Sequence, residues 1–305
     1  MQSVSSVAEA AAFLAAASED GRKVRIGEDL TAAGLDRVLE HEAGDLTCTV
    51  EAGIRLSALQ AELARAGQRL SLDPPGDPTV GALLAENVSG PLRHRFGAPR
   101  DLLLGVTLVL ADGTVANAGG KVVKNVAGYD LGRLVCGSRG RIAFIARASF
   151  RLHPLPAAAG MLVAEPDDVP AAVAAVLRSP LQPSALDVLH PGRVALLFEG
   201  AERAVQAQLE RTRALVGGVD AGPEVWAESR RRQAEARSRL SFPPGDLARV
   251  LAGVDDAIVR PAAGIAYVPG DPPSDKVSQG DPGAGSAAAL VARVKRALDP
   301  RDVLA

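Results

Sequence analysis

The spacing of apolar and polar positions predicts a mixed fold, with helices and strands interleaved along the first half of the chain. Apolar residues recur at helical spacing over 7–17, and Asp20-Gly21 ends that segment. Asp112-Gly113 stands between two apolar runs, which is a strong signal for a two-residue hairpin turn. The remaining elements expected in this half are helices over 57–66, 79–86 and 131–136, and strands over 23–26, 35–41, 46–51, 102–110, 115–118 and 142–152.

A stretch rich in Pro, Ala and Gly, Pro154–Gly160, marks the expected boundary between two domains, 1–156 and 157–305. After it, the order strand–helix–strand–strand–helix is typical of a ferredoxin-like layer. The expected elements are strands over 161–164, 185–189, 194–198, 240–242, 257–259 and 265–268, and helices over 169–177, 201–215 and 287–298. Residues 269–285 are expected to form a loop, because Pro, Gly, Ser and Asp dominate there. The fold class is therefore α+β.

Composition narrows the classes of partner. The 305 residues are 47% hydrophobic, which is enough for two cores. Basic and acidic residues nearly balance, 34 against 36, and aromatic residues make up 3%, which argues against a nucleic acid or an anionic membrane bound through bulk charge. Cys48 and Cys136 stand in apolar runs, which favours buried free thiols in a reducing, cytoplasmic setting and no metal site. The apolar stretch Ala8–Ala17 is too short for membrane insertion.

The first segment with candidate chemistry is Pro74–Gly81, where a Pro-Gly turn leads into a helix start. Free backbone N–H groups at that start, together with the helix dipole, suit a phosphate. Gly81 permits close approach of a ligand to the backbone. The commoner origin of such a pattern is a turn with a helix-capping residue, and that interpretation stays open.

A second segment concentrates three glycines, two lysines and other polar residues between the hairpin and the next helix. It reads Gly119-Gly120-Lys121-Val122-Val123-Lys124-Asn125-Val126-Ala127-Gly128-Tyr129-Asp130-Leu131. These residue types suit the lining of a polar pocket, with lysines for anionic oxygens and Asn125 for ring edges. Gly137-Ser138-Arg139-Gly140 then turns the helix into a long strand. We expect the turns at 75–81, 119–130 and 137–143 to converge on one groove.

Residues 73–156 closely resemble the FAD-binding PCMH-type domain of the vanillyl-alcohol-oxidase superfamily, and more narrowly that of the E-type FAD-binding subunits of glycolate oxidase. The resemblance rests on residues 119–131, on Pro75-Gly76 with Thr79-Val80-Gly81, on Asn87-Val88-Ser89-Gly90, and on Gly97 with Arg100-Asp101. It is strong over 46–156 and thin over 157–285. The implied fold is a PCMH-type domain of two α/β subdomains, followed by a ferredoxin-like cap whose last helix returns to the FAD domain.

The resemblance implies a non-covalently bound FAD and an oxidoreductase that acts on glycolate or a related 2-hydroxy acid. It also implies D-type flavoprotein and F-type iron–sulfur partners, with peripheral association to the inner membrane through them. The implied cofactor-binding residues are Pro75, Gly76, Thr79, Val80, Gly81, Asn87, Ser89, Gly90, Gly97, Asp101, Lys121, Lys124, Asn125, Tyr129, Asp130, Gly137, Ser138, Gly140 and Ile145. No catalytic residue and no metal ligand is assigned.

Two departures from the family pattern open an alternative. The family places a glycine-rich pyrophosphate loop after its first strand, whereas Val24-Arg25-Ile26 is followed here by Gly27-Glu28-Asp29. The family's Gly-Thr-Leu-Gly turn is Gly140-Arg141-Ile142-Ala143 in this chain. The alternative is a flavin-free scaffold subunit that has lost the loop. A free-standing flavin enzyme is a weaker third interpretation, since no acid, base or metal constellation stands out.

Two further segments are expected to be ordinary surface. Arg93-His94-Arg95 is expected to be a solvated turn, although it lies where the family approaches the flavin ring. Trp226 with Arg230-Arg231-Arg232 is expected to form the exposed face of a helix.

Overall fold

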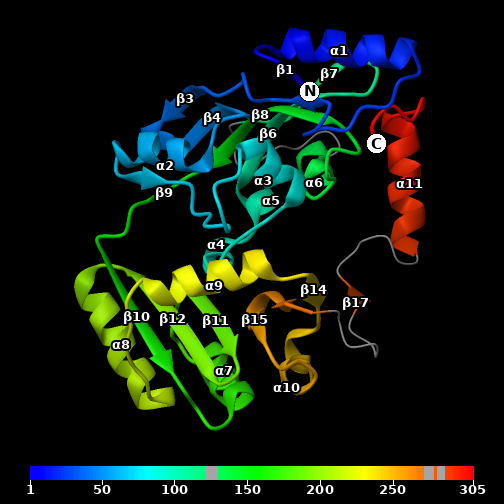
Figure 1. The fold of residues 1–305 in the computed structure, drawn as a ribbon. Helices are drawn as coiled ribbons and strands as arrows, with labels where there is room; N and C mark the ends of the chain where they lie inside the picture. Colours follow the sequence, from blue (N-terminus) through cyan, green and yellow to red (C-terminus); the bar gives the residue numbers. More distant parts are fainter. Residues whose placement is uncertain (121–129, 271–277, 280–285) are drawn as a thin grey trace.

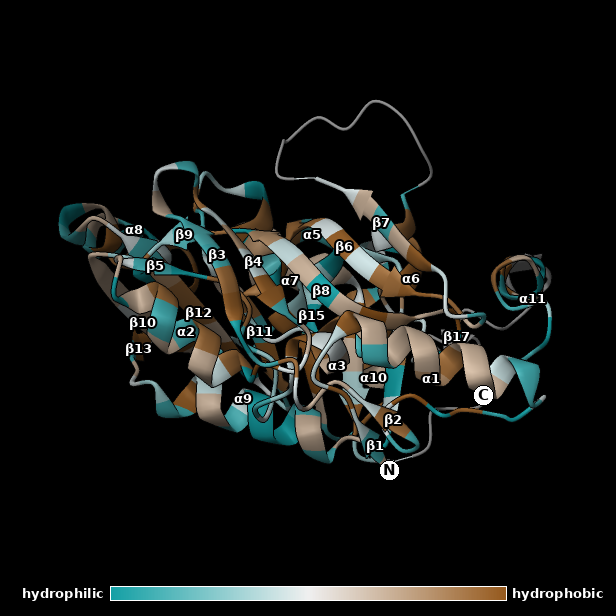
Figure 2. Cartoon of the chain, turned by 90° about the horizontal axis from the view of Figure 1, so that it is seen from above, coloured by the Kyte–Doolittle hydropathy of each residue, from teal (hydrophilic) through white to brown (hydrophobic). Residues whose placement is uncertain are grey.

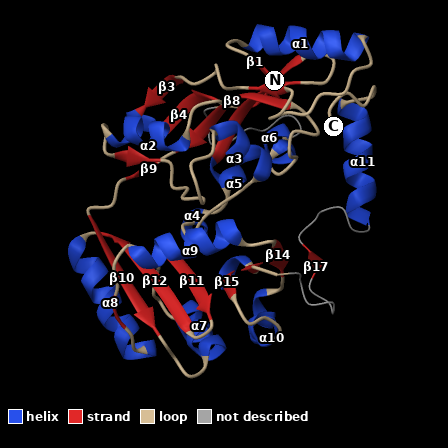
Figure 3. Ribbon diagram, viewed as in Figure 1, coloured by secondary structure: helices blue, strands red, loops and turns tan. Residues whose placement is uncertain are grey.

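Two large antiparallel sheets, each with its own helices, dominate the described residues, and two further sheets have two strands each (Figures 1 and 3). The structure is a computed structural model that describes residues 1–120, 130–270, 278–279 and 286–305. The elements of the first half are β1 Gln2–Ser3, α1 Val7–Glu19, β2 Leu30–Thr31, β3 Val38–Glu42, η1 Ala43–Asp45, β4 Thr47–Glu51, α2 Leu56–Ala64, β5 Gln68–Arg69, α3 Val80–Glu86, α4 Arg93–Phe96, α5 Pro99–Leu102, β6 Leu103–Val109, β7 Val115–Gly119, α6 Leu131–Val135, β8 Phe144–Arg151 and β9 His153–Pro154.

The first sheet has five strands in the order β3-β4-β8-β6-β7, with α1 on one face and α2 and α3 on the other (Figure 1). Its central strand β8 is buried on both faces. Phe144 and Ala146 pack in the cluster that contains α1, whereas Ala148 and Phe150 pack with α2 and α3. A register shift in the pairing of β6 with β8 moves the later residues to the second face. The mainly hydrophobic colouring of β6 and β8 in Figure 2 agrees with this double burial.

The second half forms an eight-stranded sheet in the order β13-β10-β12-β11-β15-β16-β14-β17. Its elements are β10 Ala158–Ala164, α7 Val169–Arg178, β11 Ala185–His190, β12 Arg193–Gly200, α8 Glu202–Val216, β13 Val219–Asp220, α9 Glu224–Glu235, β14 Ser238–Ser241, η2 Pro244–Asp246, α10 Leu247–Ala252, β15 Ala257–Arg260, η3 Pro261–Ala263, β16 Ile265–Val268, β17 Ser278–Gln279 and α11 Ser286–Leu298. The first four strands of this order have the expected ferredoxin-like arrangement. Helices α7 and α8 pack on one face, and α9 covers the other, between the two halves (Figure 1).

Most of the expected elements are present within a few residues, but the strand expected over 23–26 is wrong. Val24 and Ile26 form only isolated bridges, to Leu304 and Leu30 respectively. The chain turns at Gly27, whose φ is 96°, before a ladder of more than one pair can form. Residues 271–277 and 280–285, most of the expected loop, lie outside the described residues.

The two segments expected to be ordinary surface are instead part of the contact between the halves. Arg93–Phe96 form α4, which packs against β11 and η3 of the second half. Trp226 is only 4% exposed and packs with Leu92 and Ile258. The Arg232 guanidinium donates to the carbonyl of Ala257, 3.1 Å away, so this arginine ties α9 to the sheet. Partners distant in sequence therefore bury residues whose local pattern is that of a surface.

A nearly buried ion pair also joins the halves. Both terminal nitrogens of Arg69, on β5, donate to the carboxylate oxygens of Glu199, on β12, at 2.7 Å. The Arg69 side chain is 14% exposed and that of Glu199 10%. Two parallel charge-assisted hydrogen bonds fix the relative orientation of the groups as well as their distance.

Replacing Glu199 with Ala is expected to lower the free energy of unfolding by about 3 kcal/mol, because Arg69 then stays buried without its carboxylate. Glu62→Ala is the matched control, since the Arg65–Glu62 pair is exposed, and its cost is expected to be below about 1 kcal/mol. Urea unfolding of both variants measures the difference. Equal losses in the two variants would show that Arg69–Glu199 is no more than a surface contact.

Candidate functional site

The start of α3 does not offer the free N–H groups expected from the sequence. The Val80 amide donates to the Ile54 carbonyl at 2.9 Å, and the Gly81 amide donates to that of Ala52 at 2.6 Å. The next amide, of Ala82, donates to the Thr79 hydroxyl at 3.3 Å. The expectation of free amides at this helix start is therefore wrong, because neighbouring chain already accepts the donors of Val80, Gly81 and Ala82.

Packing explains why a glycine stands at position 81. A Cβ at Gly81 would lie 3.1 Å from the Ala52 carbonyl oxygen, so the glycine allows close contact between two chain segments. At Gly76, by contrast, a side chain would meet open space. Pro75 and Thr79, on either side of Gly76 in the chain, are partly exposed. The open part of the 75–81 turn is thus its first half.

The other end of α3 is where several predicted site residues meet. Asn87 ends the helix with a φ of 49°, and its side-chain oxygen accepts the Arg100 amide at 3.4 Å. The Gly137 amide donates to the Leu84 carbonyl at 3.0 Å, and the Arg139 amide donates to that of Ala85 at 3.0 Å. The turn at 137–140 and the segment 97–101 therefore contact the same helix end.

Convergence of the three predicted turns holds in part. The turn at 75–81 lies at the start of α3 and the turn at 137–140 at its end, about 10 Å apart for a helix of this length. Lys121, Lys124, Asn125 and Tyr129 lie outside the described residues. The described ends of their segment are placed: Gly120 donates to the Leu104 carbonyl at 3.1 Å, and Asp130 caps α6 by accepting the Arg133 amide at 3.0 Å.

Three predicted site residues are held by their own surroundings. A Cβ at Gly90 would overlap the Asp73 carbonyl oxygen, and one at Gly97 would lie 2.7 Å from an Asp101 carboxylate oxygen. Asp101 accepts the Ala98 amide at 2.8 Å and so closes its own loop. Steric fit between chain segments thus accounts for both glycines without a ligand.

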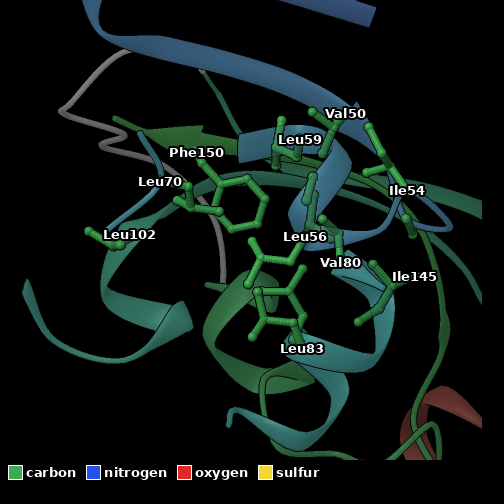
Figure 4. Close-up of a cluster of buried hydrophobic side chains, with 14 of the residues drawn as sticks. Val50, Ile54, Leu56, Leu59, Leu70, Val80, Leu83, Leu102, Ile145 and Phe150 are labelled. Atoms are coloured by element: carbon green, nitrogen blue, oxygen red, sulfur yellow. The ribbon is translucent and has the colours of Figure 1, made fainter. Parts of the chain in front are cut away.

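Two other predicted contacts, Val80 and Ile145, belong to the hydrophobic core. They are 0% and 6% exposed and lie near Leu83 in the cluster that Figure 4 shows. Ile145 lies on β8, in the pairing with β6. Apolar packing accounts for these two side chains.

The hydroxyl of Ser138, in the turn at 137–140, is unsatisfied. It is buried and has no hydrogen-bond partner among the described residues. The Ser71 and Ser184 hydroxyls are buried and unmatched as well, so the Ser138 hydroxyl is compatible with a bound group without requiring one. A side chain at Gly120, as at Gly76, would meet open space. The orphaned hydroxyl and the open glycines fit a cofactor laid along these turns.

The turn at 25–30 replaces the family's pyrophosphate loop and is closed on itself. The Gly27 amide donates to the Leu30 carbonyl at 2.8 Å, and the amides of residues 28, 29 and 30 all donate to the Arg25 carbonyl. The Arg25 amide donates to the Asp29 carboxylate at 2.9 Å. No amide from 27 to 30 is therefore left to donate to a diphosphate.

Charge in this turn is also internally balanced. The Arg25 guanidinium pairs with both Asp29 and Glu28. The hydrogen bond from that side chain, followed by the one from the Arg25 backbone, holds the pKa of Asp29 below its usual value. The turn lies against the candidate site, since a Cβ at Gly140 would be 2.8 Å from the Ile26 Cβ. The turn therefore provides no amide for a diphosphate, and the open positions of the site are those at Gly76 and Gly120.

A buried polar network joins the site to the second half. The Ser89 carbonyl accepts hydrogen bonds from Gln233 at 2.9 Å and from Arg260 at 3.1 Å. Asp73 lies beside it and accepts the Leu92 amide at 3.0 Å, with an Arg230 nitrogen 3.6 Å away. Burial raises the pKa of the Asp73 carboxyl from 3.8 to about 7, against the opposing effect of Arg260.

The two cysteine thiols are not part of this polar network. Cys48 is buried and Cys136 is half-buried, and neither is in a disulfide, as expected from the sequence. Burial raises the pKa of each thiol to about 12, so both are protonated at neutral pH.

The comparison with protein families bears on this geometry directly. A family model described as "FAD binding domain" matches residues 29–119. Residues 29–119 are therefore similar to the FAD-binding domain of that family. The matched range contains the turn at 75–81, Asn87, the loop closed by Asp101 and the hairpin of β6 and β7.

Curated relatives of the FAD-binding domain include subunits of one enzyme. Glycolate oxidase subunit GlcE of Escherichia coli (strain K12) is 31% identical over 221 residues, 69% of this chain and 62% of that protein. Glycolate oxidase subunit GlcD of Bacillus subtilis (strain 168) is 32% identical over 177 residues, 55% of this chain and 37% of that protein. The chain thus spans less than two thirds of the length of either relative. The sequence resemblance to the E-type polypeptide of glycolate oxidase is confirmed.

Solved structures show the fold of the FAD-binding domain and of the layer after it. An alkyldihydroxyacetonephosphate synthase superposes with a TM-score of 0.73 at 15% identity, over 99% of this chain and 74% of that one. The expected fold class, a PCMH-type FAD-binding fold followed by an α+β layer, is confirmed. Among the described residues, no helix combines the length and apolar character needed to cross a membrane.

The raised pKa of Asp73 predicts the direction in which the stability of the protein changes with pH. The folded pKa of Asp73 lies above its unfolded value, so the folded protein keeps a proton between about pH 4 and pH 7 that the unfolded chain loses. The stability contributed by Asp73 should therefore fall as pH rises through that window and level off above it. Asp73→Asn carries no titrating proton, so the stability difference, wild type minus variant, should fall across the same window.

Urea unfolding of wild type and D73N between pH 4 and pH 9 measures this difference. Asp77→Asn is the control, because hydrogen bonds from Ser57 lower the pKa of Asp77. The stability difference between wild type and D77N should stay level from pH 5 to pH 8. A D73N difference that grows with pH, or that stays constant, would contradict the assignment.

Proposed function

We propose that this chain is the FAD-binding subunit of an oxidoreductase that acts on glycolate or a related 2-hydroxy acid. The observation that carries the proposal is the meeting of Asn87 and the turns at 97–101 and 137–140 around the end of α3, with the unpaired Ser138 hydroxyl among them. This arrangement adjoins the residues that are similar to an FAD-binding domain. The names of the relatives GlcE and GlcD support the substrate class.

The proposed contacts follow from the open groups of the site. The Ser138 hydroxyl donates to the cofactor, and the exposed backbone at Gly76 and Gly120 lies alongside it. Bound FAD supplies the two-electron acceptor of the reaction. The chain's own residues hold and orient it without a covalent bond. The buried contact formed by Leu92, Trp226 and Ile258 keeps water from the space between the halves.

A multi-subunit assembly is part of the proposal. The relatives GlcE and GlcD are each named as a subunit of glycolate oxidase. We place this chain in the E-type position, with a D-type flavoprotein and an F-type iron–sulfur protein as partners. In that assembly the electrons taken from the substrate would leave through the partners.

The second candidate function is a flavin-free scaffold subunit of the same complex. The self-closed turn at 25–30 favours it, because that turn has no amide left for a diphosphate. Each charge-assisted hydrogen bond that is lost weakens the binding of a nucleotide by about 1.5–3 kcal/mol. The two candidates differ in one observable, which is the presence of flavin in the purified protein.

The proposal predicts that purified protein shows flavin absorption bands, or binds added FAD with quenching of flavin fluorescence. Ser138→Ala should raise the dissociation constant of FAD about tenfold, because one buried hydrogen bond is lost. Ser179→Ala is the control, since the Ser179 hydroxyl bonds to the Val176 carbonyl in the second half. Colourless wild-type protein that binds no added FAD would replace the proposal with the scaffold candidate.

A further inference from the structure

A group of arginines lies where α4 meets the second sheet, and it lacks matching carboxylates. Arg93, on α4, is half-buried, and among the described residues its guanidinium makes one hydrogen bond, to the Ser89 hydroxyl at 3.1 Å. Burial lowers the pKa of Arg93, and the nearby charges of Arg239 and Arg100 lower it further. No carboxylate of the described residues forms an ion pair with Arg93 or Arg239.

The second sheet places Arg239 and Tyr267 together opposite α4. Arg239 of β14 is the direct register partner of Tyr267 of β16, so the two side chains stand on the same face. Ile258, the partner of Tyr267 on β15, packs with Leu92 of the first half. That face therefore looks toward the FAD-binding domain.

The Tyr267 ring is also in contact with a buried arginine. The Arg260 guanidinium lies 5.0 Å from the centre of the Tyr267 ring, a cation–π contact. The Tyr267 hydroxyl has no hydrogen-bond partner among the described residues, and the residue is half-buried. Beside the Tyr267 ring stand two guanidinium groups that form no ion pair with a described carboxylate, and together with the hydroxyl they form a set of donors for an anion.

The one carboxylate close to this group is already engaged. Asp101 accepts the Ala98 amide at 2.8 Å, and its contact with Arg100 is a long one of 3.8 Å. The charges that act on Arg93 thus include the guanidinium groups of Arg100 and Arg239 and the committed carboxylate of Asp101. Arg93 is half-buried, whereas Arg100 and Arg239 are exposed, so a bound anion would offset the repulsion mainly at Arg93.

The position of the group connects it with the candidate flavin site. Arg100 and Asp101 lie near Cys136, at the start of the turn at 137–140. Arg100 also donates its amide to Asn87 at the end of α3. An anion held by Arg93 and Arg239 would lie between the two halves, beside the turns assigned to the flavin.

We infer that Arg93, Arg239 and Tyr267 form a site for the carboxylate of a small organic acid, with one donor from the first half and two from the second. A carboxylate fits because its two oxygens match the fork of a guanidinium and accept a phenolic hydroxyl at the same time. The inference rests on the proposed function for the identity of the acid, a 2-hydroxy acid. The site itself requires only the arginines and the tyrosine.

The test is calorimetric titration of the full-length protein, as purified, with oxalate and with glycolate. Arg93→Gln and Arg239→Gln should each raise the dissociation constant of oxalate tenfold or more, and Tyr267→Phe by a smaller factor. Arg239→Lys keeps the charge and should recover part of the loss. Arg211→Gln on α8 is the charge-matched control and should leave binding unchanged. Unchanged thermal unfolding of Arg239→Gln, an exposed position, shows that the variant is folded.

The outcomes separate this inference from the proposed function. Oxalate binding that depends on Arg93 and Arg239 supports the site, whether or not FAD is bound. FAD titration of the same samples tests the proposed function on its own. Absence of oxalate and glycolate binding, or equal binding by wild type and Arg239→Gln, overturns the site. Inorganic phosphate that displaces oxalate at equal concentration overturns its assignment to a carboxylate.

Discussion

The buried guanidinium of Arg260 is the interaction on which the arrangement of the two halves depends. It donates to the Ser89 carbonyl at 3.1 Å and to the Gln233 side chain at 2.7 Å, with an Asp187 oxygen 3.4 Å from its Nε. A cation with 2% exposure is tolerated only where such partners surround it. Because Ser89 belongs to the segment that leads into α4, the same cation that orders the second sheet also fixes one wall of the candidate site.

The glycines of the family motif illustrate how a fold can outlast a binding loop. Gly81, Gly90 and Gly97 are required by close contacts between chain segments, so they persist for reasons of packing. The pyrophosphate loop has no such second purpose, and at residues 25–30 it has become a turn that satisfies its own amides. The buried hydroxyl of Ser138 has no hydrogen-bond partner among the described residues, and a retained cofactor would supply one.

Local signals let the sequence predict most of the elements, and long-range contacts explain what it missed. The hairpin around Asp112-Gly113 and the ferredoxin-like order of β10 to β13 follow from turns and short connections. The burial of Trp226 and the contacts of α4 depend on residues far away in the chain, as the hydrogen bond from Arg260 to Ser89, 171 positions apart, shows. The sequence revealed the missing glycines near Gly27, but only the structure shows that the remaining amides are satisfied.

The most direct test of this account is hydrogen exchange of the native protein, because the Arg260 network should make the segment 87–97 and strand β15 open together. The account predicts that amides of both regions exchange with the same free energy of opening, and that Arg260→Met lowers it in both. Rapid exchange over 87–97 while β15 stays protected in the wild-type protein would contradict it, since the two halves would then be joined only loosely at the candidate site.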